Sequence, residues 1–137
     1  QPRSSTLLRQ LPGTETWTIR VDRLPMKEAV PADTILALDI LHYWPLSEQE
    51  TLVRWMRSCL HPGGIVWLRE GTSEGAGAAL VSAGERFTTA IGLNPSSELF
   101  FRSATAWEDL FRASGFTVDP GLPCGASNRL WRLEAIA

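Results

Sequence analysis

Two short apolar segments on either side of a helix-forming segment constrain the fold more than any other feature of this sequence. Residues 34–38 and 65–69 are each almost continuously apolar, and an acid, Asp39 or Glu70, follows each of them. Continuous apolar runs of this length are typical of strands buried on both faces of a parallel sheet. Between them, residues 47–60 combine a Ser-x-x-Glu helix start with apolar side chains at helical spacing. A strand, a helix and a strand with short joints predict a right-handed parallel unit, so we expect an α/β fold.

The flanking sequence predicts further elements of the same domain. Apolar alternation and helical spacing predict a strand at 16–21, a helix at 80–91, a helix that begins at 105–108, and strands at 116–119 and 129–136. The last two strands are joined by a short segment rich in turn residues, so we expect an antiparallel pair. Residues 1–15 predict irregular structure or a partial helix. We therefore expect one domain over residues 1–137, with a mostly parallel sheet and a C-terminal antiparallel hairpin.

The composition excludes several classes of protein. A formal net charge of -2 and 44% hydrophobic residues argue against a disordered chain and against a nucleic-acid partner. No window approaches the roughly 20 uncharged apolar residues that a membrane span needs. The two cysteines, Cys59 and Cys124, are too few for a disulfide scaffold, and with the two histidines they lack the spacing of metal ligands. We expect a cytoplasmic protein without a bound metal or a membrane segment.

Three acids stand directly after predicted strands. Asp22, Asp39 and Glu70 each occupy this position. Open α/β sheets bind ligands at the carboxyl ends of their strands, where a carboxylate can accept hydrogen bonds from hydroxyls or balance a cation. For a single acid, a loop position facing water is the better interpretation. Three acids at equivalent positions favour a ligand site.

His42 stands three residues after Asp39, just past the end of its predicted strand. Glu70 stands just past the end of the next predicted strand. Consecutive strands of a parallel unit are usually adjacent, so a histidine and a glutamate just past their ends can meet. A carboxylate bonded to one ring nitrogen fixes the tautomer and leaves the other nitrogen free to take a proton, which is the chemistry of a general base. The alternative is a histidine that caps the following turn or packs against Trp44. The residues alone favour neither interpretation.

The motifs, in their order along the chain, resemble a known family. They are Asp22, residues 32–44, residues 60–64, residues 68–70, residues 101–103, Trp107 and residues 113–116. Their order and spacing resemble the C-terminal half of class I S-adenosylmethionine-dependent methyltransferases, and the resemblance covers most of the chain from about Trp17. Leu41-His42-Tyr43-Trp44 is most similar to the Leu-His-x-Trp motif of O-methyltransferases that act on small hydroxylated substrates. The resemblance implies a Rossmann-like sheet.

The resemblance also implies roles for individual residues. In that subgroup the histidine deprotonates the acceptor hydroxyl and a glutamate after the next strand orients it, which implies these roles for His42 and Glu70. S-adenosylmethionine is the implied cofactor and S-adenosylhomocysteine the product. The other implied contacts are Asp22, Arg23, Asp39 and Ile40 with the cofactor, and Trp44, Phe87 and Asn128 with the substrate.

One part of the family's pattern has no match in this sequence. The glycine-rich first loop and the acid after the second strand are missing, and the glycines at 63–64 and 71–77 follow the wrong elements. We therefore expect the N-terminal half that holds the cofactor to have been truncated or proteolysed, with supply by another chain or loss of cofactor binding as alternatives. Without that half, the sheet keeps an open apolar edge, which a partner chain or a homo-oligomer would cover.

Two functions follow as expectations. The first is methyl transfer from S-adenosylmethionine to a small-molecule acceptor, at a hydroxyl oxygen, with His42 as the base. The parent protein would be the enzyme, and this chain alone would be inactive if the missing half is needed. The alternative is a noncatalytic half-domain that serves as a binding or assembly module through its open edge.

Overall fold

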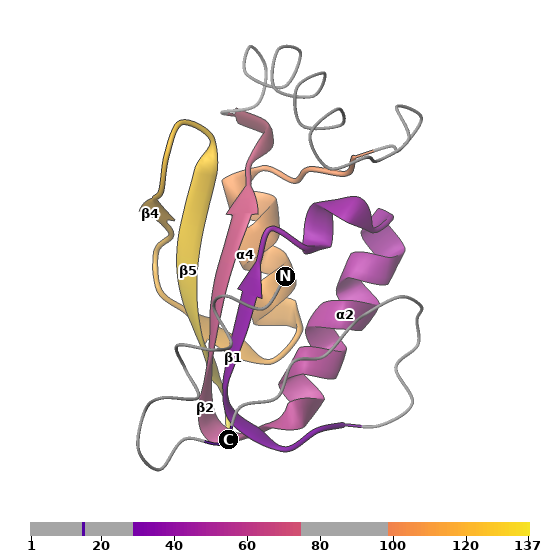
Figure 1. Cartoon of the computed structure of the whole chain (residues 1–137), viewed down its shortest axis with the longest axis vertical. Helices are drawn as coiled ribbons and strands as arrows, with labels where there is room; N and C mark the ends of the chain where they lie inside the picture. Colours follow the sequence, from indigo (N-terminus) through magenta and orange to yellow (C-terminus); the bar gives the residue numbers. More distant parts are fainter. Residues whose placement is uncertain (1–14, 16–28, 75–98) are drawn as a thin grey trace.

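The predicted strand, helix and strand are present in the computed structural model, which describes residues 15, 29–74 and 99–137 (Figure 1). The elements, in chain order, are β1 (Ala32–Leu38), the 3-10 helix η1 (Leu41–Tyr43), α2 (Leu46–Cys59), β2 (Leu60–Gly71), α4 (Ala104–Ala113), β3 (Phe116–Val118), β4 (Leu122–Pro123) and β5 (Asn128–Ala135). The predicted strand at 16–21 and the predicted helix at 80–91 lie outside the described residues. Neither α2 nor α4 has the length and apolar character that crossing a bilayer would require.

The sheet has the order β1-β2-β5-β3, and β4 pairs with β5. β1 and β2 are parallel, whereas β5 is antiparallel to β2, β3 and β4. Four of the described strands therefore run in one direction and β5 runs against them. This arrangement confirms the mixed sheet with an antiparallel C-terminal pair. The two-residue strand β4 lies in the segment that we expected to be a loop.

The two faces of the sheet differ in how far they are covered. Side chains alternate along a strand, so Val66, Leu68 and Glu70 of β2 share one face. All three are buried, on the face that α2 and α4 cover (Figure 1). The core on this side is built from large side chains that include Trp107, Phe111, Phe116 and Trp131.

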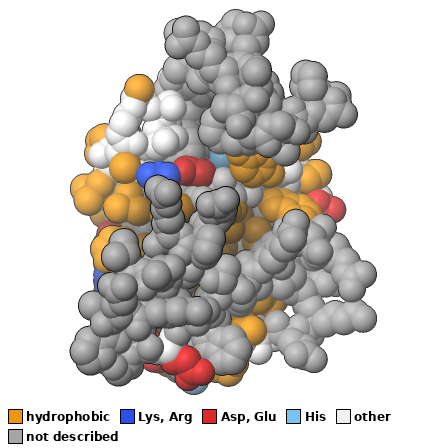
Figure 2. Space-filling model, in the orientation of Figure 1, with side chains coloured by type: hydrophobic (Ala, Val, Ile, Leu, Met, Phe, Trp, Pro, Cys, Tyr) orange, Lys and Arg blue, Asp and Glu red, His pale blue; other side chains and the backbone are white. Residues whose placement is uncertain are grey.

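The opposite face carries hydrophobic side chains at the surface (Figure 2). Leu36 is 50% exposed, Leu38 45% and Trp67 36%. The prediction that residues 34–38 are buried on both faces is therefore wrong, since only Ala37 of β1 is buried. Among the described residues, no strand pairs with the second edge of β1 and no helix covers Leu36 and Leu38, which leaves these side chains accessible.

In both α2 and α4, the N-cap residue lies two positions before the predicted one. The N-cap of α2 is Pro45, whose carbonyl accepts hydrogen bonds from the N–H groups of Glu48 and Gln49 at 2.9 Å. Ser47, the predicted cap, lies in the first turn. The N-cap of α4 is Ser103 in place of the predicted Thr105, and its hydroxyl accepts the Ala106 N–H at 3.1 Å. Both predicted caps are wrong because an extended residue upstream already ends the preceding segment.

Candidate functional site

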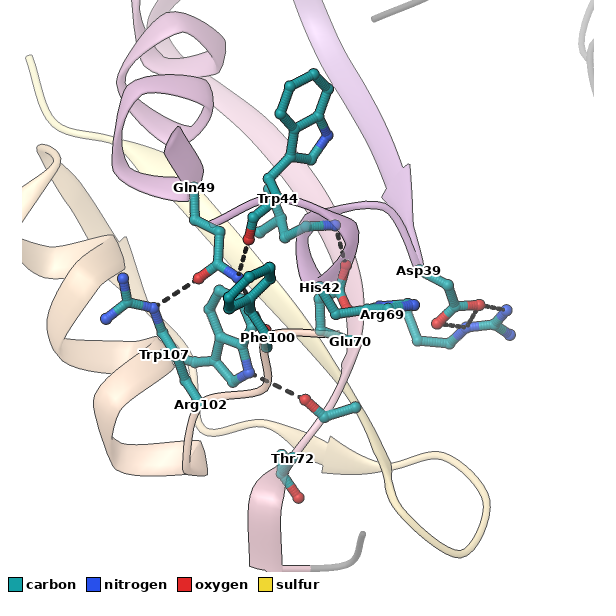
Figure 3. A network of polar contacts seen from close by, with 12 residues as sticks. Asp39, His42, Trp44, Gln49, Arg69, Glu70, Thr72, Phe100, Arg102 and Trp107 are labelled. Atoms are coloured by element: carbon teal, nitrogen blue, oxygen red, sulfur yellow. Dashed lines mark hydrogen bonds and ion pairs between the residues drawn. The ribbon is translucent and has the colours of Figure 1, made fainter. Parts of the chain in front are cut away.

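A turn after β1 brings η1 across the carboxyl end of β2. Asp39 has a φ of 57°, in the left-handed region, and its N–H donates to the Arg69 carbonyl at 2.8 Å. The chain therefore leaves the sheet at Asp39 and folds η1 over the end of the neighbouring strand. This turn places His42 beside Glu70 (Figure 3).

His42 and Glu70 form a buried pair. The side chain of Glu70 is fully buried, and His42 is 7% exposed. Nδ1 of His42 lies 2.6 Å from Oε2 of Glu70, and the Leu41 N–H donates to Oε1 at 2.5 Å. A carboxylate oxygen accepts hydrogen bonds, so the contact assigns the donor role to Nδ1; in the neutral ring the lone pair then lies on Nε2. The structure thus brings together the two residues to which the sequence assigned general-base chemistry.

Aromatic rings border the His42 imidazole. The Phe101 ring stacks on it with centroids 5.0 Å apart and an angle of 13°, and the Tyr43 ring lies at 4.2 Å. Burial raises the pKa of the Tyr43 phenol above its ordinary value, and the negative charges of Asp39 and Glu70 raise it further. The phenol therefore stays neutral at physiological pH. The imidazole is held on its face by Phe101 and at Nδ1 by Glu70.

Asp39 makes a separate ion pair with Arg69. Nε of Arg69 donates to Oδ1 at 3.2 Å and to Oδ2 at 3.0 Å, and a terminal guanidinium nitrogen also contacts Oδ2. The hydrogen bond to Asp39, together with its charge, raises the pKa of Arg69. The Asp39 side chain is 31% exposed, and the pair points away from the His42–Glu70 contact (Figure 3). Ile40, the next residue, packs against the core as a partly buried side chain.

The other predicted site residues are placed as follows. Trp44 is partly buried against the core directly after η1, and its carbonyl accepts a hydrogen bond from Gln49. Asn128 begins β5 opposite Gly71, one position beyond Glu70, so it shares this end of the sheet. The predicted residues Asp22, Arg23 and Phe87 lie outside the described residues.

Sequence reasoning missed a second polar cluster beside His42. Nε2 of Gln49 donates to the carbonyls of Trp44 and Phe100 at 3.0 and 2.8 Å, and Oε1 accepts from Nε of Arg102 at 2.8 Å (Figure 3). One signal for Gln49 was present in the sequence. It stands three, four and seven residues before Leu52, Val53 and Met56, so a polar residue occupies the apolar face of the helix.

Within residues 29–74 and 99–137, no group of three or more acidic, histidine or cysteine side chains is arranged to hold a metal ion. The cysteines Cys59 and Cys124 are both free. At the strand ends, the carboxylates of Glu70 and Asp39 instead have partners within the chain, His42 and Arg69.

Comparison with known proteins identifies structures that are similar to this chain. No protein-family model matches the sequence, and no curated protein matches it. Among solved structures, the chain is similar to an O-methyltransferase family protein from Burkholderia thailandensis, with 20% identity and a TM-score of 0.60 over 80% of this chain and 32% of that chain. It is also similar to human N-acetylserotonin methyltransferase in complex with S-adenosylmethionine, with 22% identity and a TM-score of 0.60 over 81% of this chain and 32% of that one.

A third similar structure is an O-methyltransferase family 2 protein from Planctomyces limnophilus in complex with apigenin. It is 22% identical, with a TM-score of 0.57 over 85% of this chain and 32% of that chain. The chain thus spans about a third of the length of the solved structures that it matches. The likeness shows that the described fold is that of class I S-adenosylmethionine-dependent O-methyltransferases, as the sequence motifs implied.

Proposed function

We propose that the whole protein transfers a methyl group from S-adenosylmethionine to a hydroxyl oxygen of a small molecule, with His42 as general base and Glu70 as its orienting partner. One observation carries the proposal: a histidine with Nδ1 bonded to a fully buried carboxylate, at the carboxyl ends of two parallel strands. In an open α/β sheet this is the edge where ligands bind. The O-methyltransferase fold adds the class of reaction.

The geometry supports a single proton transfer. S-adenosylmethionine, when bound, would supply the methyl group to the acceptor oxygen and keep the electron pair of its broken carbon–sulfur bond. Nε2 of His42 would take the proton of the acceptor hydroxyl. Glu70 stabilises the imidazolium that forms, because its carboxylate already accepts the Nδ1 hydrogen at 2.6 Å. The fixed ring holds Nε2 in one orientation, which lowers the entropy cost of aligning the acceptor. The proton then leaves to solvent when the product departs.

The residues proposed to bind the cofactor are chosen by the chemistry of their side chains. S-adenosylmethionine supplies an electrophilic methyl group on a positively charged sulfur, together with a cationic amino group. Asp39 fits such a cation, because its carboxylate is partly exposed and keeps lone-pair capacity beyond the bonds to Arg69. We propose Ile40 as its apolar neighbour there, and Asp22 and Arg23 as the residues at the adenine. Two similar structures hold S-adenosylmethionine and S-adenosylhomocysteine, respectively.

The substrate side is proposed from Trp44, Phe87 and Asn128. Trp44 and Asn128 border the same strand ends as His42. An aromatic ring and an amide suit a small, hydroxylated and partly apolar acceptor. Apigenin, found in one of the similar structures, is a molecule of that kind.

A pair of histidine substitutions tests the base. His42→Gln in the whole protein should lower kcat about 100- to 10,000-fold, because the lone pair that accepts the proton is lost. The affinity for S-adenosylhomocysteine, measured by calorimetry, should stay within about twofold. The matched control is His61→Gln, since His61 is the other histidine of the chain and is exposed. Unchanged turnover in His42→Gln would remove His42 from the chemistry.

The exposed face of β1 favours the second candidate function, a noncatalytic assembly module. Leu36 and Leu38 are about half exposed, at 50% and 45%, along a strand that has no described partner on its second edge. Such an edge pairs readily with another chain. Calorimetry with S-adenosylhomocysteine separates the two functions: saturable binding by the whole protein supports the enzyme, and its absence supports the module.

A further inference from the structure

Gln49 is the only fully buried amide side chain among the described residues, and it lies on a helix face that is otherwise apolar. A buried amide without hydrogen bonds is strongly unfavourable, whereas an apolar side chain of the same length needs none. Gln49 has three bonds, to the carbonyls of Trp44 and Phe100 and from the guanidinium of Arg102. We therefore infer that the amide at position 49 serves to link the separate chain segments to which it is hydrogen-bonded.

Both carbonyls belong to segments that hold His42. Trp44 directly follows η1, which carries the histidine. The N–H of Phe100 donates to the carbonyl of His42 itself at 2.8 Å, and the next ring, Phe101, stacks on the imidazole. One amide thus ties the η1 segment to residues 99–103, and residues 99–103 cover one face of the base.

Arg102 fixes the other end of the same segment. Besides the bond to Gln49, it donates to the carbonyl of Leu46 at 2.9 Å and stacks over the Trp107 ring at 5.7 Å. The N–H of Ser73 donates to its carbonyl at 3.0 Å, just beyond the end of β2. Residues 99–103 are therefore anchored to α2, to α4 and to the strand that carries Glu70.

We propose that Gln49 is a positioning residue, which holds residues 99–103 and the Phe101 ring against His42 and so fixes the plane of the imidazole. The inference rests on the proposed function only for its consequence, the aim of Nε2 at the acceptor hydroxyl. Glu70 alone allows the ring to swing about the Nδ1 contact, since one hydrogen bond leaves the torsions of the side chain free to adjust. Stacking on Phe101 removes that freedom, and Gln49 keeps Phe101 in place.

Kinetics distinguish this role from simple stabilisation. Gln49→Met keeps the length of the side chain and removes all three hydrogen bonds. We expect kcat to fall about 10- to 100-fold through misalignment, with KM for the cofactor within about twofold. Leu52→Ala is the matched control, because it weakens the same buried face of α2 without touching the amide. A protein that is folded and keeps wild-type kcat in Gln49→Met would overturn the inference.

Nuclear magnetic resonance of the ring gives a readout that does not depend on turnover. With ¹⁵N-labelled histidine, Gln49→Met should shift the His42 ring signals and weaken the ring-current effect of Phe101. In the same variant, the His61 ring signals should stay at their wild-type positions. In Leu52→Ala, the ring signals of both histidines should stay there. If His42→Gln keeps full turnover, the proposed function fails, and these spectra still decide whether Gln49 fixes the ring.

A second variant covers the case in which Gln49→Met does not fold. Gln49→Glu retains an acceptor for Arg102 but lacks the two donors to the carbonyls of Trp44 and Phe100. It should show the same shift of the His42 signals and the same loss of kcat. Unchanged His42 signals in a folded Gln49→Glu protein would overturn the inference.

Discussion

Glu70 and Asp39 occupy equivalent places in the sequence, yet the structure gives them opposite environments. Each acid stands at the carboxyl end of a strand of one parallel pair. Glu70 is fully buried and holds His42 and the Leu41 N–H. Asp39 has a side chain that is 31% exposed and pairs with Arg69. The position after a strand therefore does not determine what the acid does.

The alternation of side chains explains the difference. Glu70 continues the face of Leu68 and Val66, which α2 and α4 cover. Asp39 would follow Ala37 onto that same face, but its φ of 57° ends the alternation of β1. Its carboxylate contacts Arg69 of β2. Arg69 points to the uncovered face of the sheet, because Leu68 and Glu70 on either side of it are buried on the face that the helices cover. The left-handed turn at Asp39 thus separates a buried carboxylate that contacts His42 from one that is partly open to solvent.

Replacing Glu70 by its amide tests the buried half of the comparison and should have the largest effect. In Glu70→Gln, the new N–H₂ group competes with the Nδ1–H of His42, so one donor is left unsatisfied or the ring changes tautomer. We expect a loss of about 1–3 kcal/mol in the free energy of unfolding, measured by urea denaturation. Turnover should also fall, because the other tautomer has no lone pair at Nε2.

The control for Glu70→Gln is Glu134→Gln, which changes a carboxylate on β5 whose side chain is 45% exposed. Its free energy of unfolding should match that of the wild type within about 0.5 kcal/mol. Equal losses in the two variants would show that the buried contact adds nothing beyond an exposed ion pair.

The same change at Asp39 tests the exposed half and should have a smaller effect on stability. Asp39→Asn loses the charge of a partly exposed pair, which contributes under about 1 kcal/mol. The loss should shrink further in 1 M salt, where charges on the surface are screened. By contrast, the affinity for S-adenosylhomocysteine should fall clearly, since Asp39 is proposed at the cationic end of the cofactor. A stability loss as large as that of Glu70→Gln would contradict the comparison.

The sequence predicted the parts of this site that depend on local pattern and neighbouring strands. The apolar runs gave the parallel pair, and its adjacency brought His42 to Glu70. The left-handed turn at Asp39 was not predicted, because an aspartate after a strand has many allowed turns. The exposure of Leu36 was missed since burial depends on what covers a strand, which the strand's own residues do not encode.

The cluster at Gln49 marks the limit of such reasoning. Its polar character on an apolar helix face was visible, but its partners, Phe100 and Arg102, stand 51 and 53 residues away. Hydrogen bonds across that distance follow from the packing of α2 against the segment before α4. The helix starts were misplaced for a more local reason. Ser103 caps α4 with its own hydroxyl, whereas α2 begins after Pro45 without any side-chain cap, and each residue stands two positions before the predicted cap.

Tyr43 reports on both carboxylates at once and gives the finest test of the comparison. Its pKa lies above the ordinary value of 10.0, first through burial, then through the charge of Asp39 and last through that of Glu70. We therefore expect Asp39→Asn to lower the pKa of Tyr43 more than Glu70→Gln does. Tyrosinate absorbance measures this directly, because Tyr43 is the single tyrosine of the chain, with Tyr43→Phe as the blank.

The raised pKa also sets the sign of a small pH effect on stability. A phenol whose pKa is higher in the folded protein stabilises it fully below pH 10, and this contribution is lost as the pH rises through the folded value. The free energy of unfolding should therefore fall less steeply above pH 10 in Tyr43→Phe than in the wild type. If Glu70→Gln lowered the pKa of Tyr43 more than Asp39→Asn, Glu70 would be its stronger electrostatic neighbour. The expected order, in which Asp39 acts more strongly on Tyr43 than Glu70, would then be wrong.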